Sequence, residues 1–374
     1  MIVDTHVYCF RAPDHVAGHA SAEEHMKYWQ WGHAGHHQPA FSTRDRRVGD
    51  ASALMDPAPD DPWRVADRNF RVDRDHGRMI WTVDGEDFTK HYFPPGIVEF
   101  PPGACIGEMD YAGIDWSLMH VDQTLDKSNE YVAECVRAYP DRLRSMAIVE
   151  EQLIPTDPDR AIEGARHAIE DLGLHALKII PDYAYRMTDS QSFDDASWTP
   201  FWDAATQLRV PIFFTLGPAA NDPDTREGFV QVLWQLRRWS DRYPDTQVSV
   251  THGYPWRAYV EGERLVMPPD SFAPLRDSRI HLEVSFPIRI GDLIDYPYRG
   301  CWPVLDQMVD EIGADRLMYG TDMPFQNRFC TYRQSRDWIE KYMPERIGQD
   351  AVDAIMGGTA ARFLKLPVTV SAPR

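Results

Sequence analysis

The sequence opens with MIVDTHVYCF, where strand-forming residues are interrupted by polar side chains at every second position. Asp4, His6 and Tyr8 are expected to share one face of a strand, because successive side chains point to opposite faces. With histidine at the third of these positions, two imidazoles would lie side by side as metal ligands. This chain has Tyr8 there. The segment is therefore a metal site with one ligand changed, a site without a metal, or a buried strand end.

Seven further short apolar runs follow, and helical patterns separate most of them. Successive runs lie about 25 to 36 residues apart, which is the length of one βα unit. With the opening strand they make eight, which predicts an α/β fold, a (β/α)8 TIM barrel that spans residues 1–374 as a single domain. The runs are 117–122, 142–149, 175–181, 210–217, 247–253, 280–286 and 316–322, and the clearest helical patterns are 157–171, 224–243, 304–312 and 350–364.

Residues 9–116 interrupt this alternation after the first strand. The stretch is too long for a loop, so we expect an insertion that emerges at the C-terminal face of the barrel as a lid or a subunit contact. Residues 78–83 (RMIWTV) predict a strand inside it, followed by a turn at Asp84-Gly85.

Two groups of side chains stand out in the insertion. Trp29, Trp31 and Trp81 suggest a buried or subunit-facing aromatic patch. The histidines of the HAGHH segment are flanked by glycine and proline, and we expect them on the solvated surface. They are His33, His36 and His37.

Composition narrows the class of protein. The formal net charge of −19 argues against nucleic acid or an anionic membrane as a partner. No apolar run reaches the roughly 18 residues of a membrane span, and the N-terminus lacks the pattern of a secretory signal. The five cysteines are scattered, odd in number and free of C-x-x-C pairs, which favours reduced thiols in a cytoplasmic enzyme.

In a TIM barrel, functional side chains gather at the C-terminal ends of the strands. Most of the residues at these predicted ends are polar. A buried imidazole or carboxylate costs several kcal/mol unless it is paired or bound to a metal, so this number at one mouth indicates a functional site. The candidates are His6, Tyr8, His120, Asp122, Lys178, Asp182, Thr215, His252, Glu283 and Asp322.

Four motifs resemble the amidohydrolase superfamily, in particular the amidohydrolase-related branch that includes the aminocarboxymuconate-semialdehyde and resorcylate-type decarboxylases. The resemblance covers both ends of the chain and the barrel between them, but not the insertion. The motifs are DTH at 4–6, THG at 251–253, YGTDMP at 319–324 and IMGGTAARFL at 355–364.

The resemblance implies a divalent metal, usually zinc or manganese. It assigns His6 and Asp322 as metal ligands and His252 as the residue that acts as an acid or base or polarises the substrate. We predict His252 as a third metal ligand as well, with His252 and Asp322 as the catalytic residues. Two positions depart from the family pattern, because Tyr8 and Thr215 stand where histidines are expected. A neutral imidazole binds zinc better than a hydroxyl, and a tyrosine must first lose a proton with a pKa near ~10.

Tyr8, Lys178, Thr215 and Glu283 are predicted to contact substrate. Tyr8 is open to three roles: a phenolate ligand that favours Fe(III), a hydrogen-bond donor to substrate, or a side chain that blocks the metal. Lys178 is either a bridging ligand or the partner of a carboxylate such as Asp182. Glu283 is either an extra carboxylate of the site or a partner for Arg289.

Three functions are consistent with these residues. The first is a metal-dependent enzyme, a decarboxylase or hydrolase, that acts on a small carboxylated substrate. The second is a subunit of an oxygenase with this fold, which would use iron or keep a vestigial site. The third is a non-catalytic barrel subunit. The family resemblance also implies a homodimer, or a hetero-oligomer with a related barrel subunit.

Overall fold

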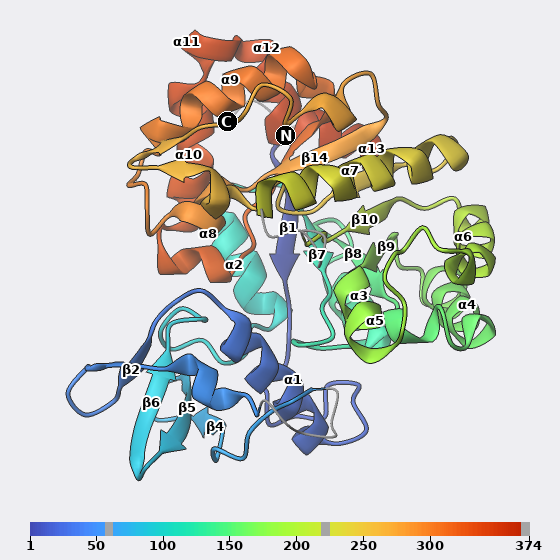
Figure 1. Ribbon diagram of the computed structural model, residues 1–374. Coiled ribbons are helices and arrows are strands. Elements are labelled where there is room, and N and C mark those ends of the chain that lie inside the picture. The colour runs from blue at the N-terminus through green and yellow to red at the C-terminus, as the bar shows by residue number, and fades with distance from the viewer. Residues whose placement is uncertain (57–62, 218–224, 368–374) are drawn as a thin grey trace.

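The computed structural model describes residues 1–56, 63–217 and 225–367 (Figure 1). Eight parallel strands form one sheet in the order β1-β7-β8-β9-β10-β11-β14-β15. This confirms the predicted barrel, and each strand lies within the apolar run that predicts it or extends one residue beyond it. The strands are β1 (Val3–Tyr8), β7 (Trp116–His120), β8 (Leu143–Ile148), β9 (Ala176–Ile179), β10 (Ile212–Phe214), β11 (Val248–Val250), β14 (Ile280–Val284) and β15 (Leu317–Tyr319).

The segment that follows β15 returns to β1 and brings the two ends of the sheet together. The Asp322 N–H donates to the His6 carbonyl at 2.8 Å, and the Tyr8 N–H donates to the Met323 carbonyl at 2.7 Å. Asp4 strengthens this contact, because its buried carboxylate accepts hydrogen bonds from the Thr321 N–H at 3.1 Å and from the His6 N–H at 2.9 Å. The closure therefore places the first and last predicted site residues side by side.

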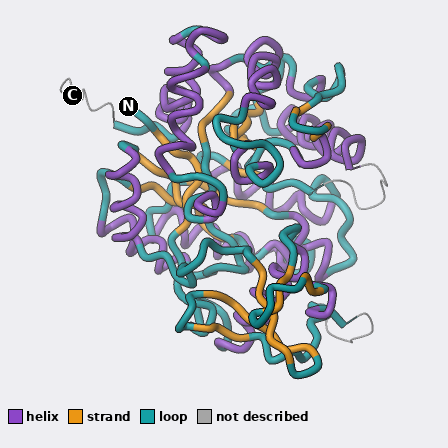
Figure 2. The backbone as a smooth tube through the Cα atoms, turned by 90° about the vertical axis from the view of Figure 1, so that its left-hand side faces the viewer, coloured by secondary structure: helices purple, strands orange, loops and turns teal. Residues whose placement is uncertain are grey.

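Helices surround the strands, as the tube in Figure 2 shows. The predicted helix 350–364 is broken into two, with a π-helical turn at Ala354–Gly358 between them. A Cβ on Gly357 would lie 2.4 Å from the Met1 carbonyl oxygen, so the chain passes too close to its own N-terminus for a larger residue. The helices are α2 (Pro102–Ala112), α3 (Asn129–Ala138), α4 (Pro158–Arg166), α5 (Pro181–Met187), α6 (Thr199–Ala205), α7 (Thr225–Arg242), α8 (Phe286–Ile290), α9 (Trp302–Glu311), α10 (Tyr332–Tyr342), α11 (Pro344–Ile347), α12 (Gln349–Asp353) and α13 (Thr359–Phe363).

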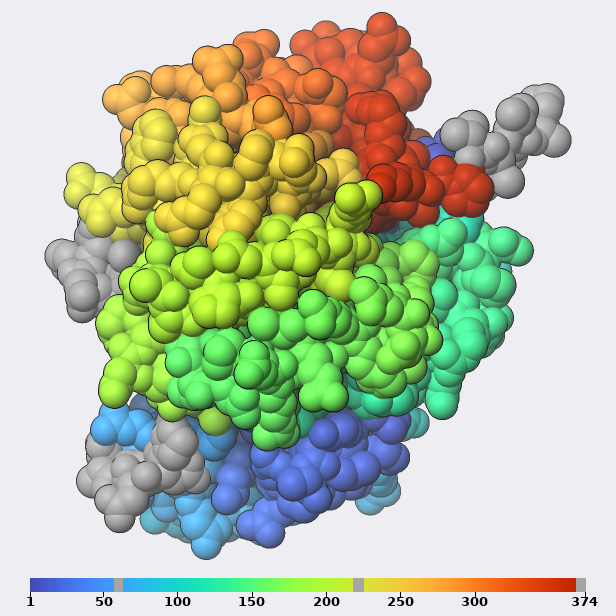
Figure 3. Space-filling view, turned by 90° about the vertical axis from the view of Figure 1, so that its right-hand side faces the viewer, coloured from blue at the N-terminus to red at the C-terminus, as the bar shows by residue number. Residues whose placement is uncertain are grey.

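Most of the segment between β1 and α2 forms a separate layer beyond the C-terminal end of β1 (Figure 1). It contains α1 (Ala22–Gly35) and an antiparallel sheet of order β3-β2-β6-β5-β4. In the space-filling view this blue and cyan segment forms one end of the molecule (Figure 3). The strands are β2 (Ala40–Ser42), β3 (Val48–Gly49), β4 (Arg71–Asp73), β5 (Arg78–Val83) and β6 (Glu86–Lys90).

The predicted strand at 78–83 is confirmed as β5, and Asp84 and Gly85 form the two-residue turn to β6. Both turn residues have positive φ, 51° and 78°, which is the geometry of the tight turns that suit a twisted hairpin. Trp29 and Trp81 are fully buried, as predicted. Trp31 is half-buried and packs in a separate cluster, against Trp63 and Tyr183.

The expectation of a solvated histidine cluster is wrong for His33. That side chain is 1% exposed, and its Nδ1 lies 2.8 Å from the Trp29 carbonyl oxygen one helical turn earlier. His33 is buried because α1 directs it toward the same interior as Trp29. His36 is half-buried and His37 is exposed.

All five cysteines are buried and free, which agrees with the predicted reduced thiols. Within the three described ranges, every helix is too short or too polar to cross a membrane.

Candidate metal centre

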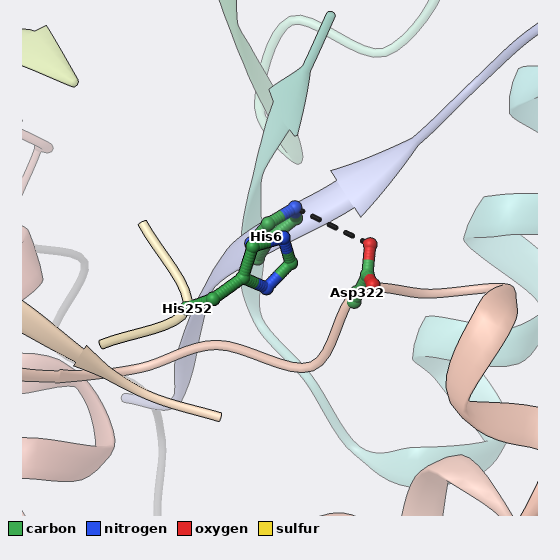
Figure 4. A group of neighbouring side chains, drawn as sticks. All are labelled: His6, His252 and Asp322. Atoms are coloured by element: carbon green, nitrogen blue, oxygen red, sulfur yellow. Dashed lines mark ion pairs between the residues drawn. The ribbon is translucent and has the colours of Figure 1, made fainter. Parts of the chain in front are cut away.

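Three side chains from distant parts of the chain converge at the C-terminal end of the barrel. His6 lies on β1, His252 follows β11 and Asp322 follows β15 (Figure 4). The His6 Nε2 atom is 3.4 Å from Asp322 Oδ1, and the rings of His6 and His252 have centroids 4.4 Å apart. One ligand atom from each of the three lies within 4.8 Å of the others, so the structure brings together the predicted ligand set.

Two of these residues sit in a strained backbone conformation. His252 and Asp322 have φ values of 64° and 67°, in the left-handed region that residues with a side chain seldom occupy. Such conformations cost of order 1–3 kcal/mol each and persist where the surrounding structure fixes them, often at functional sites. Here the His252 carbonyl accepts a hydrogen bond from Trp256 Nε1 at 2.7 Å, and the turn aims the imidazole at His6.

Glu283, on β14, holds both histidines. Its Oε2 accepts a hydrogen bond from the His252 N–H at 2.8 Å and lies 2.9 Å from His6 Nδ1. Because Glu283 Oε2 already accepts from the His252 N–H, it acts as an acceptor toward His6 as well, and the proton of the His6 ring is therefore on Nδ1. The lone pair of His6 Nε2 then faces Asp322. This is the orientation that a metal-binding histidine obtains from an outer carboxylate.

His120, at the end of β7, is a site residue that the predicted ligand and substrate sets omit. Its ring stacks on His6 with centroids 3.5 Å apart and an interplanar angle of 11°. His120 Nε2 lies 2.8 Å from the Thr5 carbonyl oxygen and 3.3 Å from Glu283 Oε1. His120 Nε2 donates its proton to the Thr5 carbonyl and is not available to bind a metal. His120 therefore packs against His6 and orients its ring. The sequence signal that could have identified His120 as a site residue was its position as a polar residue at the end of a predicted strand.

Tyr8 and Lys178 are neighbours. The Lys178 ammonium donates to the Tyr8 hydroxyl oxygen at 3.0 Å, and that oxygen is 3.2 Å from His6 Nε2. Burial raises the pKa of Tyr8 well above its usual value, and the Asp322 carboxylate adds to the effect. Tyr8 is therefore a neutral phenol, which favours a hydrogen-bond donor over a phenolate ligand. The predicted pairing of Lys178 with Asp182 is wrong, since the two form no ion pair and Asp182 is exposed.

Thr215 follows β10, where the family places a histidine. Its hydroxyl is buried and has no hydrogen-bond partner among the described residues. Thr215 does not line the cavity at the barrel mouth. The predicted contact of Thr215 with substrate therefore remains a prediction.

Burial controls the charges of the centre. It lowers the pKa values of His6, His120 and His252 well below the usual range, so all three are neutral imidazoles, the form that binds metals. It also raises the pKa of Asp322 to about 8, against the opposing effect of Arg328. A cation bound there would favour the carboxylate.

The donor set fits a divalent cation. His6 Nε2 is oriented by Glu283, His252 Nδ1 is buried with no partner among the described residues, and Asp322 supplies a carboxylate. Two imidazoles and one carboxylate are a common catalytic set, which leaves further coordination positions for water or substrate. Tyr8 and Thr215 replace the other two expected ligands, so this centre has fewer protein ligands than the family pattern.

A cavity of about 140 Å³ opens next to the three residues. Its wall combines barrel residues with residues of the segment between β1 and α2. The second group, His36, His37 and Tyr92, was missed by sequence reasoning because only the folded chain brings it over the mouth. The barrel side is lined by Tyr8, Asp122, Leu125, His252, Ile288, Arg289, Asp322, Phe325 and Arg328.

Known proteins with similar sequence or fold include decarboxylases and a hydrolase. The γ-resorcylate decarboxylase of a Polaromonas species is 24% identical over 248 residues, which cover 59% of this chain and 70% of that enzyme. Alignments with the curated γ-resorcylate decarboxylases span 65–70% of those enzymes' own length.

Two examples represent the solved structures that share the fold. The first is a dihydroxybenzoic acid decarboxylase from a Polaromonas species, with bound manganese and the inhibitor 2-nitroresorcinol. It has a TM-score of 0.51 at 20% identity, over 72% of this chain and 87% of that one. The second is a probable 2-pyrone-4,6-dicarboxylic acid hydrolase from Acinetobacter baumannii, with a TM-score of 0.52 at 14% identity, over 72% and 90%.

The family model described as amidohydrolase matches residues 109–366, which is more than half of the sequence and includes seven of the eight barrel strands. This chain therefore belongs to the amidohydrolase family.

Proposed function

We propose that this chain is a divalent-metal-dependent decarboxylase of a small aromatic carboxylate. The observation that carries the proposal is the convergence of His6, His252 and Asp322 beside a small cavity. The γ-resorcylate decarboxylases and the manganese-containing structural relative support the choice of reaction and metal. Zinc or manganese is the expected ion.

When bound, the cation would act as a Lewis acid toward a substrate oxygen. His6, His252 and Asp322 would hold it. The reaction replaces the carboxylate by a proton: the ring carbon gains the proton, the bond to the carboxylate breaks, and its electron pair returns to the ring as CO2 leaves.

The chain's own residues supply the proton and the hydrogen bonds. Asp322 lines the cavity and can relay a proton to the ring carbon. The neutral imidazole of His252 can stabilise negative charge that develops on a substrate oxygen. The Tyr8 hydroxyl, held by Lys178, can donate a hydrogen bond to the same oxygen.

Hydrolysis is the second candidate, because the same centre could activate a water molecule. An oxygenase component is the third, and one observation favours it: two imidazoles and one carboxylate are also the ligand set of non-haem iron oxygenases. A non-catalytic barrel is disfavoured by the ionisable side chains buried at the mouth, which reduce stability unless they are used.

The test combines metal analysis with an assay of CO2 release. Wild type, Asp322→Ala and the exposed-carboxylate control Asp159→Ala are purified without a histidine tag. We expect ~1 zinc or manganese per chain in wild type and in the control, and much less in Asp322→Ala. Metal-loaded wild type should release CO2 from γ-resorcylate or a related hydroxybenzoate, and Asp322→Ala should not.

The other outcomes contradict the proposal in distinct ways. Iron with oxygen-dependent turnover would indicate the oxygenase. Release of an acid from a lactone or ester, without CO2, would indicate the hydrolase. A metal-free protein that becomes more stable as Asp322→Ala would indicate the non-catalytic barrel.

Two further expectations come from the cysteine pattern and from the family resemblance, respectively. These are a cytoplasmic location and a dimer, either of this chain or with a related barrel subunit. Light scattering on the purified protein tests the second.

A further inference from the structure

Arg289 is a positively charged side chain at the cavity that pairs with no other side chain in the part of the chain that the structure describes. It lies in the last turn of α8, the short helix that follows β14, and it lines the cavity together with His252 and Asp322. Its side chain donates no hydrogen bond to the residues described in 1–56, 63–217 and 225–367, and it forms no ion pair with them. The sequence-based pairing of Glu283 with Arg289 is wrong, because Glu283 is occupied by His6 and His252.

The second arginine of the cavity is different. Arg328 donates to the Tyr92 carbonyl at 2.8 Å and lies 2.9 Å from His36 Nε2. Its Nε donates to the Phe325 carbonyl at 3.1 Å. These contacts hold the wall of the cavity together. Arg328 therefore has a structural reason to be present, and Arg289 lacks one.

The two carboxylates that line the cavity form no ion pair with Arg289, although the charge of Asp322 attracts it across the cavity. Asp122 accepts hydrogen bonds from the Tyr183 hydroxyl at 2.6 Å and the Thr124 N–H at 2.8 Å. Asp322 Oδ1 lies 3.4 Å from His6 Nε2. A guanidinium remains charged at any ordinary pH, and a charge removed from water without a partner lowers stability. Such a site is stabilised when an anion binds.

We propose that Arg289 binds the carboxylate of the substrate, and that the substrate is a monocarboxylate built on a single small ring. The inference rests on the proposed function and names the residue that would recognise its substrate. The planar guanidinium offers parallel N–H donors that match the two oxygens of a carboxylate. One free arginine matches one carboxylate.

The shape of the cavity agrees with this substrate. Its volume of about 140 Å³ is below the ~300–1,000 Å³ of typical ligand pockets. Aromatic rings form part of the wall: Phe325 contacts Tyr8 edge-on with centroids 5.6 Å apart, and Tyr92 at 5.6 Å. Arg289 and Asp322 line the same cavity as these rings, so a ring bound there lies within reach of both side chains.

The experiment measures binding, not turnover. The probes are benzoate and its neutral isostere benzamide, titrated into metal-loaded protein and followed by ligand-observed NMR. The proteins are wild type, Arg289→Met, Arg289→Lys and the control Arg299→Met. Arg299 is an exposed arginine that packs against the Trp302 ring, 4.8 Å from its centroid, and it does not line the cavity.

We expect wild type to prefer benzoate over benzamide. Arg289→Met should weaken benzoate binding by about 10- to 100-fold, the loss typical of a charge-assisted hydrogen bond, and leave benzamide binding unchanged. Arg289→Lys should give an intermediate loss, because it keeps the charge but not the two-pronged geometry. Unchanged metal content and thermal unfolding in both variants show that they fold.

Three results would overturn the inference: equal benzoate binding by wild type and Arg289→Met, equal binding of both probes by wild type, or no binding of benzoate by wild type. The proposed function fails separately. If benzoate binds through Arg289 but no hydroxybenzoate releases CO2, the carboxylate site stands and the decarboxylase does not. If CO2 is released and Arg289→Met binds benzoate normally, the reverse is true.

Discussion

Replacing Glu283 by alanine tests whether this carboxylate orients the metal ligands. The substitution removes the oxygen that faces the His6 Nδ1–H at 2.9 Å and the His252 N–H at 2.8 Å. Glu283 and His6 are fully buried, so water cannot replace the lost acceptor without a cavity that admits it. Each buried donor left without a partner costs about 1–3 kcal/mol, which gives about 2–6 kcal/mol of unfolding free energy for the pair.

The same substitution should weaken metal binding by about 10- to 100-fold, the usual effect of removing an outer partner of a metal-binding histidine. Glu283→Gln should lose much less. Its amide oxygen can accept both N–H groups, and its amide nitrogen then occupies the position of Oε1, 3.3 Å from the Thr5 hydroxyl. The comparison separates the loss of an acceptor from the loss of a charge.

Urea unfolding of the metal-free protein gives the first quantity, and competition with a chelator gives the second. Glu227→Ala, an exposed carboxylate in the first turn of α7, serves as the matched control and should change stability by less than ~0.5 kcal/mol. The reasoning fails if Glu283→Ala binds metal as tightly as wild type. It also fails if the glutamine and alanine variants lose equal affinity, because the acceptor would then be irrelevant.

Two further predictions concern groups outside the ligand set. Burial raises the pKa of Glu151 from 4.5 to about 8. The folded protein thus binds a proton that the unfolded chain releases, and this group lowers the unfolding free energy as pH rises through that range. Glu151→Gln should remove that contribution, so the unfolding free energy measured in urea should depend less on pH between pH 5 and 8. If the Gln123 amide flips, its oxygen, which is buried and without a partner among the described residues, can accept from the new amide. A variant with the wild-type dependence on pH would contradict this assignment. Arg328→Met should detach the cavity wall, because it removes the contacts to Tyr92 and His36. Hydrogen exchange and proteolysis should then increase in residues 36–56 and 63–92, and unchanged rates would show that the wall is held by other contacts.

The sequence by itself determined the barrel. Alternating apolar runs and helical patterns are local signals, and each parallel strand is buried on both faces, so its composition reports its structure directly. Local composition also made β5 and its turn at Asp84-Gly85 predictable inside the insertion. The residues at the strand ends also followed, because the barrel places all such ends on one face.

The partners of those residues were decided only by the tertiary structure. His6 and Asp322 are separated by most of the chain and meet because the segment after β15 returns to β1. Glu283 was open between a role in the site and a pairing with Arg289. The left-handed turn at His252 decides between these two roles, because it directs a backbone N–H toward the Glu283 carboxylate.

Local sequence patterns also could not predict which side chains of the insertion are buried. His33 has the neighbours of a surface residue in sequence, and only the packing of α1 places it in the interior. An unpartnered Arg289 cannot be recognised until the position of every other charge at the mouth is known. Sequence patterns specify which side chains reach a surface, but their pairing depends on long-range geometry, because the energy of a buried charge is set by what lies within a few ångströms of it.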